Sequence, residues 1–284
     1  MRPGKARLAR TAWSCDDLLM RTLISLLVWL LLTACNSPHP DRSGELEASS
    51  GLRVLTYNIH HGAGTDGVID LERIAAVIRA ADADLVALQE VDRGVERTGR
   101  VDQPTELAAL TGMRVIFEKN ITYQGGDYGN AVLTRLPVLK HTNHYLPQTR
   151  PGEQRGMLEV HVIKAGRPMV FFATHFDYHA DDTERLASAD MLRGLVEGLA
   201  NKQVVVAGDL NTTPGSAVMG KLESFLQDSH RPEDGSGYTY PAGEPDRRID
   251  YVLSHPESGY KVVSCRVMDE AVASDHRPLL VEFE

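Results

Sequence analysis

Cysteine, tryptophan and long hydrophobic runs are scarce in this sequence of 284 residues. It has three cysteines, two tryptophans and 6% aromatic residues, and its long apolar run covers only residues 23–34. A single run of that kind excludes a protein with several membrane spans. The remaining composition, 42% hydrophobic and 24% charged, is ordinary for a globular protein and excludes collagen-like and disordered chains. This length allows one large α/β domain.

The apolar run near the N-terminus indicates an export signal. It reads LISLLVWLLLTA, follows Arg21 and ends at Cys35. About a dozen apolar residues are too few to span a bilayer comfortably, but they suit the core of a secretory signal. Residues 32–35, LTAC, resemble a bacterial lipobox, whose cysteine is acylated and becomes the first residue. We expect residues 1–34 to be a lipoprotein signal peptide and Cys35 to carry lipid; an uncleaved anchor and an ordinary signal peptide are the alternatives.

Two further predictions concern this leader. Asp16 and Asp17 are unusual in a segment that should be basic, so Met20 is an alternative start of the protein. A lipid on Cys35 would place the protein in the cell envelope, anchored to a bacterial membrane and facing the periplasm or the exterior. Residues 35–51 begin with that cysteine and continue with Ser, Pro, Gly and charge, which predicts a flexible tether to a folded domain at residues 52–284.

Cleavage before Cys35 would leave a chain still poorer in cysteine, tryptophan and positive charge. The leader holds both tryptophans, five basic residues and two acidic ones, so 25 basic and 37 acidic residues remain, a net charge of −12. Such a surface does not attract polyanions overall. Once Cys35 is lipidated, Cys265 stands alone, so no disulfide can form within the domain.

Hydrophobic periodicity predicts alternating strands and helices in residues 52–284. Apolar runs at residues 53–58, 85–90 and 203–207 indicate buried strands. Residues 70–81 place their apolar side chains on one face of a helix, and a second helix is expected at 183–199. Further strands are expected near residues 113–118, 130–134, 138–146, 155–163, 168–174, 248–253, 261–268 and 278–283. This mixture predicts an α/β fold with mixed sheets covered by helices.

Polar side chains close five of these apolar strands. They are Asn58, Glu90, Asp209 with Asn211, Asp250, and Asp275 with His276. Strand ends of a layered α/β protein converge on one edge, where ligands bind. Four carboxylates gathered there would repel one another unless a cation lies among them, and oxygen ligands favour Mg²⁺ or Mn²⁺ over Zn²⁺. The acids therefore predict a magnesium-type site.

Seven motifs carry a family resemblance. YNIHHG, LVALQEVD, GNAVLTR, ATHFD, VAGDLNTTP, RIDYVL and ASDHRPL, in this order, resemble the motif series of the endonuclease/exonuclease/phosphatase superfamily, which includes DNase I, sphingomyelinases and inositol polyphosphate 5-phosphatases. The resemblance covers nearly all of residues 52–284, and its most specific parts are GDLN and SDHRP. It implies a four-layered α-β-β-α sandwich of the DNase I-like type, with two mixed sheets packed face to face, and metal-dependent phosphoester hydrolysis.

The resemblance also implies residue roles. Glu90 would be the main metal ligand, with Asn58 in the same shell and Asp275 nearby, and the ion would be Mg²⁺, with Mn²⁺ or Ca²⁺ as alternatives. Asp209 and Asn211 would bind the scissile phosphate and the attacking water. The remaining catalytic residues would be His276 as general base or phosphate ligand, Asp250 as its hydrogen-bond acceptor, and His175 as a second cation facing the phosphate.

Five residues are expected to contact substrate. Abasic-site endonucleases carry an acid where this chain has His60, so we expect His60 to face the phosphate; for His61, contact and no contact are equal alternatives. A zinc role for the pair is not expected, because adjacent residues leaving a strand point in different directions. The others are Arg93, for which a solvated loop is an equal alternative, Tyr128 at the cavity rim, and Asn130 of GNAVLTR.

The membrane tether decides the expected substrate. It would hold the active site near lipid, which favours a phospholipid or another small phosphodiester or phosphomonoester. An extracytoplasmic DNase I-like nuclease is the main alternative, disfavoured by the net charge of −12 and by the loss of both tryptophans. A binding lipoprotein without catalytic activity is the second alternative, although the complete set of catalytic side chains is present. We expect a monomer.

Overall fold

Twelve strands in two sheets form the centre of the domain, in a computed structural model that describes residues 51–284. The first sheet has the order β11-β12-β1-β2-β4-β3, and the second β5-β6-β7-β8-β10-β9. The strands of the first are β1 (Leu52–Asn58), β2 (Leu85–Arg93), β3 (Arg114–Tyr123), β4 (Gly126–Thr134), β11 (Val262–Val267) and β12 (Leu279–Phe283). Those of the second are β5 (Val138–Tyr145), β6 (Gly156–Lys164), β7 (Arg167–His175), β8 (Val204–Asp209), β9 (Gln227–Asp228) and β10 (Asp250–Ser254).

Both sheets are mixed, as the sequence predicts. β1 is parallel to β2, and β7 is parallel to β8, whereas the other neighbouring pairs are antiparallel. The central strands are apolar along their whole length because both of their faces are covered. Successive side chains point to opposite faces, so Val54 enters the core between the sheets while Leu55 enters the core beneath the helices of the first sheet.

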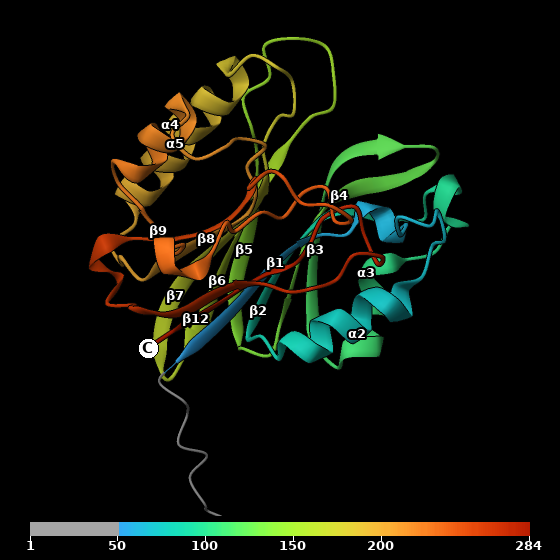
Figure 1. Ribbon diagram of the computed structural model, residues 1–284, viewed down its shortest axis with the longest axis horizontal. Coiled ribbons are helices and arrows are strands. Elements are labelled where there is room, and N and C mark those ends of the chain that lie inside the picture. Colours follow the sequence, from blue (N-terminus) through green and yellow to red (C-terminus); the bar gives the residue numbers. More distant parts are fainter. Residues whose placement is uncertain (1–50) are drawn as a thin grey trace, which may run out of the picture. The chain divides into compact units, whose positions relative to one another are not determined.

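Two α-helices cover the outer face of each sheet (Figure 1). α2 (Leu71–Ala81) and α3 (Gln103–Thr111) pack on the first sheet, and α4 (Thr183–Gly198) and α5 (Ala217–Glu223) pack on the second. Three apolar cores result, one between the sheets and one beneath each pair of helices. The predicted four-layered α-β-β-α sandwich is therefore confirmed.

Helix α2 illustrates how local sequence specifies these layers. The carboxylate of Asp70 accepts a hydrogen bond of 3.1 Å from the backbone N–H of Arg73 and caps the first turn. Leu71, Ile74 and Ile78, three residues of the predicted apolar face, are buried against the first sheet. Each such side chain contributes about 1.5–3 kcal/mol when fully buried.

Two helices and one hairpin were not predicted from the sequence. The apolar residues of α3 are consecutive, at positions 107–110, and α5 has only 7 residues, so neither shows a clear helical period. β3 and β4 are longer than expected and form a hairpin whose turn residues, Gln124 and Gly125, have left-handed φ values of 44° and 78°. Two-residue hairpin turns favour that conformation, which Gly125 adopts without strain.

The predicted leader, the lipidated Cys35 and the tether lie outside the described residues. β1 begins at Leu52, where the sequence places the start of the folded part. Within residues 51–284, no helix has both the length and the apolar character needed to cross a membrane.

Candidate active site

A cavity of about 470 Å³ opens beside the ends of β2, β7 and β8. That volume suits a small organic ligand. Seven of its lining residues are among those singled out from the sequence: Glu90, Tyr128, His175, Asp209, Asn211, Asp275 and His276. His175 and Asp209 meet because they end the parallel strands β7 and β8 at one edge of the fold, whereas Glu90 reaches the cavity from within β2 and His276 from the loop before β12.

His175, Asp209 and Asp250 form a row across three neighbouring strands. His175 on β7 is in register with Asp209 on β8, which is in register with Asp250 on β10. Gly208 explains how β7 and β8 come so close. A Cβ atom there would lie 2.0 Å from the carbonyl oxygen of Thr174, so the glycine of the GDLN motif is needed for the spacing of the row.

His276 lies between two buried carboxylates. Its Nδ1 is 2.9 Å from Oδ2 of Asp250, and its Nε2 is 3.7 Å from Oδ2 of Asp209. Burial lowers the pKa of His276, but the facing charges of Asp250, Asp209 and Asp275, with the Asp250 hydrogen bond, raise it by more, to about 10. These carboxylates favour the charged form of the ring, which suits a phosphate ligand better than a general base.

Asp209 has an environment that disfavours its charge. Burial and the neighbouring charge of Asp250 raise its pKa, whereas His276 and hydrogen bonds lower it by less. These hydrogen bonds come from the backbone N–H of Asn211 to Oδ1, at 2.9 Å, and from Nδ2 of Asn58 to Oδ2, at 3.2 Å. A carboxyl with a raised pKa can accept a proton near neutral pH.

The surroundings of His175 disfavour the positive charge that the resemblance implies for it. The side chain is buried, and burial first, then the charges of Arg155 and His276, hold its pKa well below 6.5. Nη1 of Arg155 lies 3.0 Å from Nδ1 of His175, and Nδ2 of Asn211 lies 3.0 Å from Nε2. The permanent positive charge here belongs to Arg155.

The side chain of Asn58 bridges the two sheets. Its Nδ2 donates to Oε1 of Glu90 at 3.0 Å and to Oδ2 of Asp209 at 3.2 Å. Its Oδ1 accepts from the backbone N–H of His60 at 3.0 Å. The amide nitrogen of Asn58, rather than its oxygen, therefore faces the carboxylates, so in this geometry Asn58 joins two acidic side chains instead of offering its oxygen to an ion.

His60 and His61 lie in η1 (His60–Gly62), a single 3-10 turn after β1. Both have left-handed φ values, 45° and 46°, and their ring centroids are only 4.4 Å apart. The expectation that these adjacent side chains diverge is wrong, because it assumes an extended backbone. The left-handed turn brings both rings together beside Glu90.

Two groups of possible metal ligands occur among residues 51–284, each with its ligand atoms within 4.8 Å of one another. Asp209, Asp250 and His276 form one, and there the imidazole already lies against both carboxylates. His60, His61 and Glu90 form the other. A half-buried carboxylate with two imidazoles suits a divalent cation, so the predicted involvement of Glu90 fits an ion, although not one bound by oxygen alone.

Of the five predicted substrate contacts, only Tyr128 lines the cavity; His60, His61, Arg93 and Asn130 do not. The guanidinium of Arg93 pairs with Asp127 at 2.6 Å and stacks on Phe117. The side chain of Asn130 is buried and donates to the carbonyl oxygen of Gly156 at 2.9 Å. The structure therefore places Arg93 and Asn130 outside the cavity lining, because each is already engaged by another part of the domain.

Comparison with known proteins agrees with this geometry. The sequence model of the Endonuclease/Exonuclease/phosphatase family matches residues 55–276. The chain belongs to this family. An uncharacterized protein of Escherichia coli K12, YbhP, is 27% identical over 261 residues, which cover 86% of this chain and 99% of the relative.

Solved structures of the family show the same fold. An endonuclease/exonuclease/phosphatase from Beutenbergia cavernae is 28% identical with a TM-score of 0.63, over 82% of this chain and 71% of that chain. A mannosyl-6-phosphatase from Bacteroides thetaiotaomicron is 20% identical with a TM-score of 0.68, over 82% of this chain and 99% of that chain.

Several cavity residues of this family member were missed from the sequence. They include Arg155 and Glu153, whose side chains form an ion pair of 2.6 Å, and Tyr178, Tyr240 and Arg247. Arg155 is buried, and its charge is close enough to His175 to lower that residue's pKa. No motif marks these positions, because they lie on loops that the fold, and not the local sequence, brings to the cavity.

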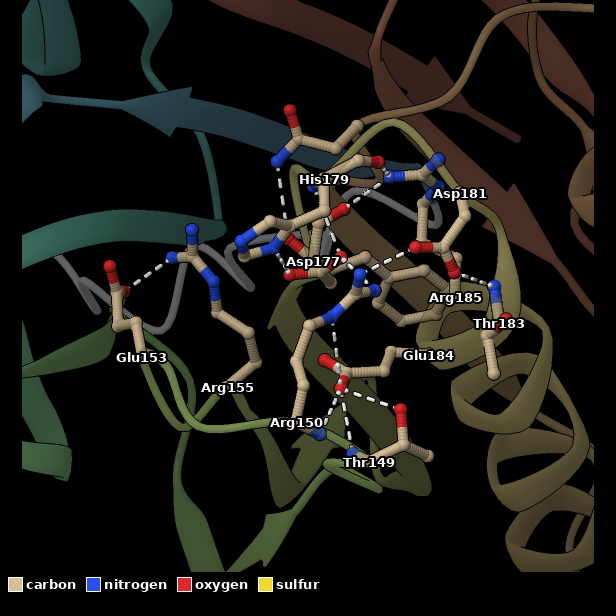
Figure 2. Close-up of polar contacts among 12 residues, drawn as sticks. Thr149, Arg150, Glu153, Arg155, Asp177, His179, Asp181, Thr183, Glu184 and Arg185 are labelled. Carbon is tan, nitrogen blue, oxygen red and sulfur yellow. Dashed lines mark hydrogen bonds and ion pairs between the residues drawn. The ribbon is translucent and has the colours of Figure 1, made fainter.

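A polar network supports the loop that carries Glu153 and Arg155 (Figure 2). The carboxylate of Glu184, at the start of α4, accepts hydrogen bonds from the backbone N–H groups of Thr149 and Arg150, at 2.6 and 3.1 Å. The guanidinium of Arg150 also forms an ion pair with Asp181, in the loop before α4. The loop before β6 is thereby tied to the second helical layer.

Proposed function

We propose that the protein is a divalent-metal-dependent hydrolase of small phosphoesters, held at a bacterial membrane by a lipid on Cys35. One observation carries the chemistry: Glu90, Asp209, Asn211 and His276 line the same cavity of about 470 Å³. Hydrolysis of a phosphoester requires neutralised phosphate oxygens, an activated water and a stabilised leaving oxygen. This set of side chains can meet all three needs, and family membership supports phosphoester hydrolysis.

Each catalytic group has a role that its contacts support. A divalent ion at Glu90 would supply positive charge to the phosphate oxygens. The hydrogen bond between Nδ1 of His276 and Asp250 directs Nε2 toward Asp209 and the cavity, where it can hold a phosphate oxygen or transfer a proton. Asp209, held by the N–H of Asn211, is placed to orient the attacking water and take its proton.

The cavity walls support a small substrate. Tyr123, Tyr128, Tyr178 and Tyr240 line it together with Arg97, Arg155 and Arg247. Aromatic rings with hydroxyl groups suit the apolar face and the hydroxyls of a sugar- or polyol-like ring, and arginines suit its anionic groups. A phospholipid headgroup or a phosphorylated polyol of that size would fit about 470 Å³.

An extracytoplasmic nuclease remains the second candidate. Arg97 and Arg247 line the cavity and could contact the backbone of a nucleic acid strand. Arg97, however, is paired with the buried carboxylate of Asp92 through bonds of 2.8 and 3.0 Å, so its charge is largely compensated. The net charge of −12 that would remain after cleavage before Cys35 also disfavours a polyanion with many phosphate contacts.

A substrate screen tests the proposal. The purified chain is incubated with Mg²⁺, Mn²⁺ or Zn²⁺ and a panel of phospholipids, polyol phosphates and nucleotides, and in parallel with supercoiled plasmid. We expect release of phosphate or headgroup from a small substrate and its loss in His276→Ala. Plasmid nicking that disappears in His276→Ala, without turnover of any small substrate, would establish the nuclease instead. Labelled fatty acid should be incorporated by the wild type and not by Cys35→Ala.

A further inference from the structure

Three side chains, of which Glu90 lines the cavity, are arranged to reach a common point. His60, His61 and Glu90 each offer a ligand atom, and these atoms lie within 4.8 Å of one another. Zinc ligands stand about 2.0–2.2 Å from the ion, so atoms this close can reach one ion through small side-chain rotations. Two imidazoles and a carboxylate also form the ligand set of many catalytic zinc sites and other transition-metal sites.

The backbone of all three residues has an unusual conformation. The φ values of His60, His61 and Glu90 are 45°, 46° and 59°, in the left-handed region that residues with a Cβ rarely adopt. Each such conformation costs on the order of 1–3 kcal/mol and persists only where the surrounding structure imposes it. Its consequence here is that two adjacent rings lie together instead of on opposite sides of a strand.

Each of the two rings has a nitrogen that is free to bind an ion. Nδ1 of His60 lies 3.2 Å from the carbonyl oxygen of Ala63, and because a carbonyl only accepts, Nδ1 carries the proton and Nε2 keeps its lone pair. A backbone carbonyl bound to the second ring nitrogen is a typical support of a metal-ligating histidine. Nδ1 of His61 is buried without a hydrogen-bond partner among the described residues, a deficit that an ion could satisfy.

The turn itself is held by a buried side chain. Nε2 of Gln103 donates to the carbonyl oxygen of His61 at 2.7 Å, and Oε1 of Gln103 accepts from the backbone N–H of Asp92 at 3.0 Å. Gln103 thus joins the histidine turn to β2, the strand that carries Glu90. The backbone segments that carry the three side chains are therefore held next to each other by the fold, and the side chains themselves need only small rotations.

We propose that His60, His61 and Glu90 bind a first-row transition-metal ion, Zn²⁺ or Mn²⁺, in preference to Mg²⁺. Mg²⁺ requires oxygen ligands in near-octahedral geometry, whereas imidazole nitrogen suits transition-metal ions. The use of this ion in catalysis rests on the proposed function, but its binding does not, since binding is measured without substrate.

Metal titrations of single variants test the proposal. The full chain, made without a histidine tag and stripped of metal by a chelator, is titrated calorimetrically with Mn²⁺, Zn²⁺ and Mg²⁺. We expect one Mn²⁺ or Zn²⁺ site that binds at least about tenfold more tightly than Mg²⁺, and a loss of about tenfold or more in Mn²⁺ affinity in His60→Gln and in His61→Gln. His141→Gln, at an exposed histidine on β5, is the matched control and should bind as the wild type does.

A spectroscopic measurement on the wild type tests the proposal even if the histidine variants fail to fold. Pulsed electron paramagnetic resonance of the Mn²⁺-loaded chain should show coupling to imidazole nitrogen. Absence of that coupling, or wild-type Mn²⁺ affinity in both folded histidine variants, overturns the proposal. Phosphoester hydrolysis without nitrogen coupling would refute the ion assignment and leave the proposed function intact. Nitrogen coupling without turnover of any phosphoester would support the ion assignment and refute the proposed function.

Discussion

Nδ1 of His276 lies 2.9 Å from Oδ2 of Asp250, and both side chains are buried. The two residues are far apart in the sequence, but the end of β10 and the loop before β12 bring them together. A buried carboxylate that accepts from one ring nitrogen fixes the orientation of the imidazole and stabilises its charge. This pair should therefore determine whether Nε2 of His276 can act on a phosphate.

Asp250→Asn should lower kcat by about 10²–10⁴-fold, because the amide orients the ring wrongly and no longer stabilises its charge. KM should change much less, since Asp250 does not line the cavity. Steady-state kinetics on the substrate found in the screen would measure both constants. The control is Asp190→Asn on α4, which removes an exposed ion-pair partner of Lys221 on α5. A wild-type kcat in Asp250→Asn would contradict the role given to His276.

Arg155→Gln should reduce kcat/KM by about 10–100-fold, the loss expected for a charge-assisted hydrogen bond of about 1.5–3 kcal/mol. The guanidinium is the buried cation beside His175, and its removal also leaves Glu153 without its ion-pair partner. The measurement is initial rate against substrate concentration. Arg114→Gln, at an exposed arginine on β3, should be neutral. Equal kinetics of the two variants would show that Arg155 is only structural.

Some of the proposed catalytic side chains could be predicted from strand order, because His175 ends β7 and Asp209 ends β8, and parallel neighbours bring such ends to one edge. Glu90 instead lies within β2, and His276 lies in the loop before β12. The period of apolar residues distinguishes helices from strands and so predicts mixed sheets covered by helices, whereas the four-layered arrangement is what the family resemblance implies. Helix α3 was missed because few of its residues are buried and its pattern is weak.

The metal-ligand group and the position of Arg155 could not be predicted, because they depend on backbone conformation and on the paths of loops. Left-handed φ values are readily expected at glycine but not at His60, His61 or Glu90, so the convergence of these side chains is invisible in the sequence. Arg155 contacts His175 across the fold, and the loop before it is held by Glu184, a contact between segments about 35 residues apart.

Gly208→Ala should destabilise the domain by about 1–3 kcal/mol and reduce activity at least about tenfold. The added Cβ would overlap the carbonyl oxygen of Thr174 and force apart the strands that carry His175 and Asp209. Gly194→Ala is a matched control, because that glycine lies exposed within α4 with open space around its Cβ position. It should stabilise the helix by about 0.5–1 kcal/mol. Thermal unfolding and kinetics of both variants would show whether the effect is specific to the β7–β8 contact.

Glu184→Gln should lower the free energy of unfolding by about 1.5–3 kcal/mol at neutral pH, because the buried carboxylate accepts three hydrogen bonds from Thr149 and Arg150. Burial raises the pKa of Glu184, but these hydrogen bonds lower it by more, so the folded pKa lies below the ordinary 4.5. A lowered folded pKa means that the carboxylate stabilises the fold fully above pH 4.5 and loses this effect as pH falls through the folded value.

The difference in Tm between the wild type and Glu184→Gln should therefore be largest at neutral pH and should shrink in acid. Glu197→Gln, at an exposed position on the same helix, should show almost no difference at any pH. Activity should also fall in Glu184→Gln, because the loop that carries Arg155 is held by this carboxylate (Figure 2). A Tm difference that stays constant between neutral pH and strong acid would show that volume and packing, and not the charge of Glu184, hold the loop in place.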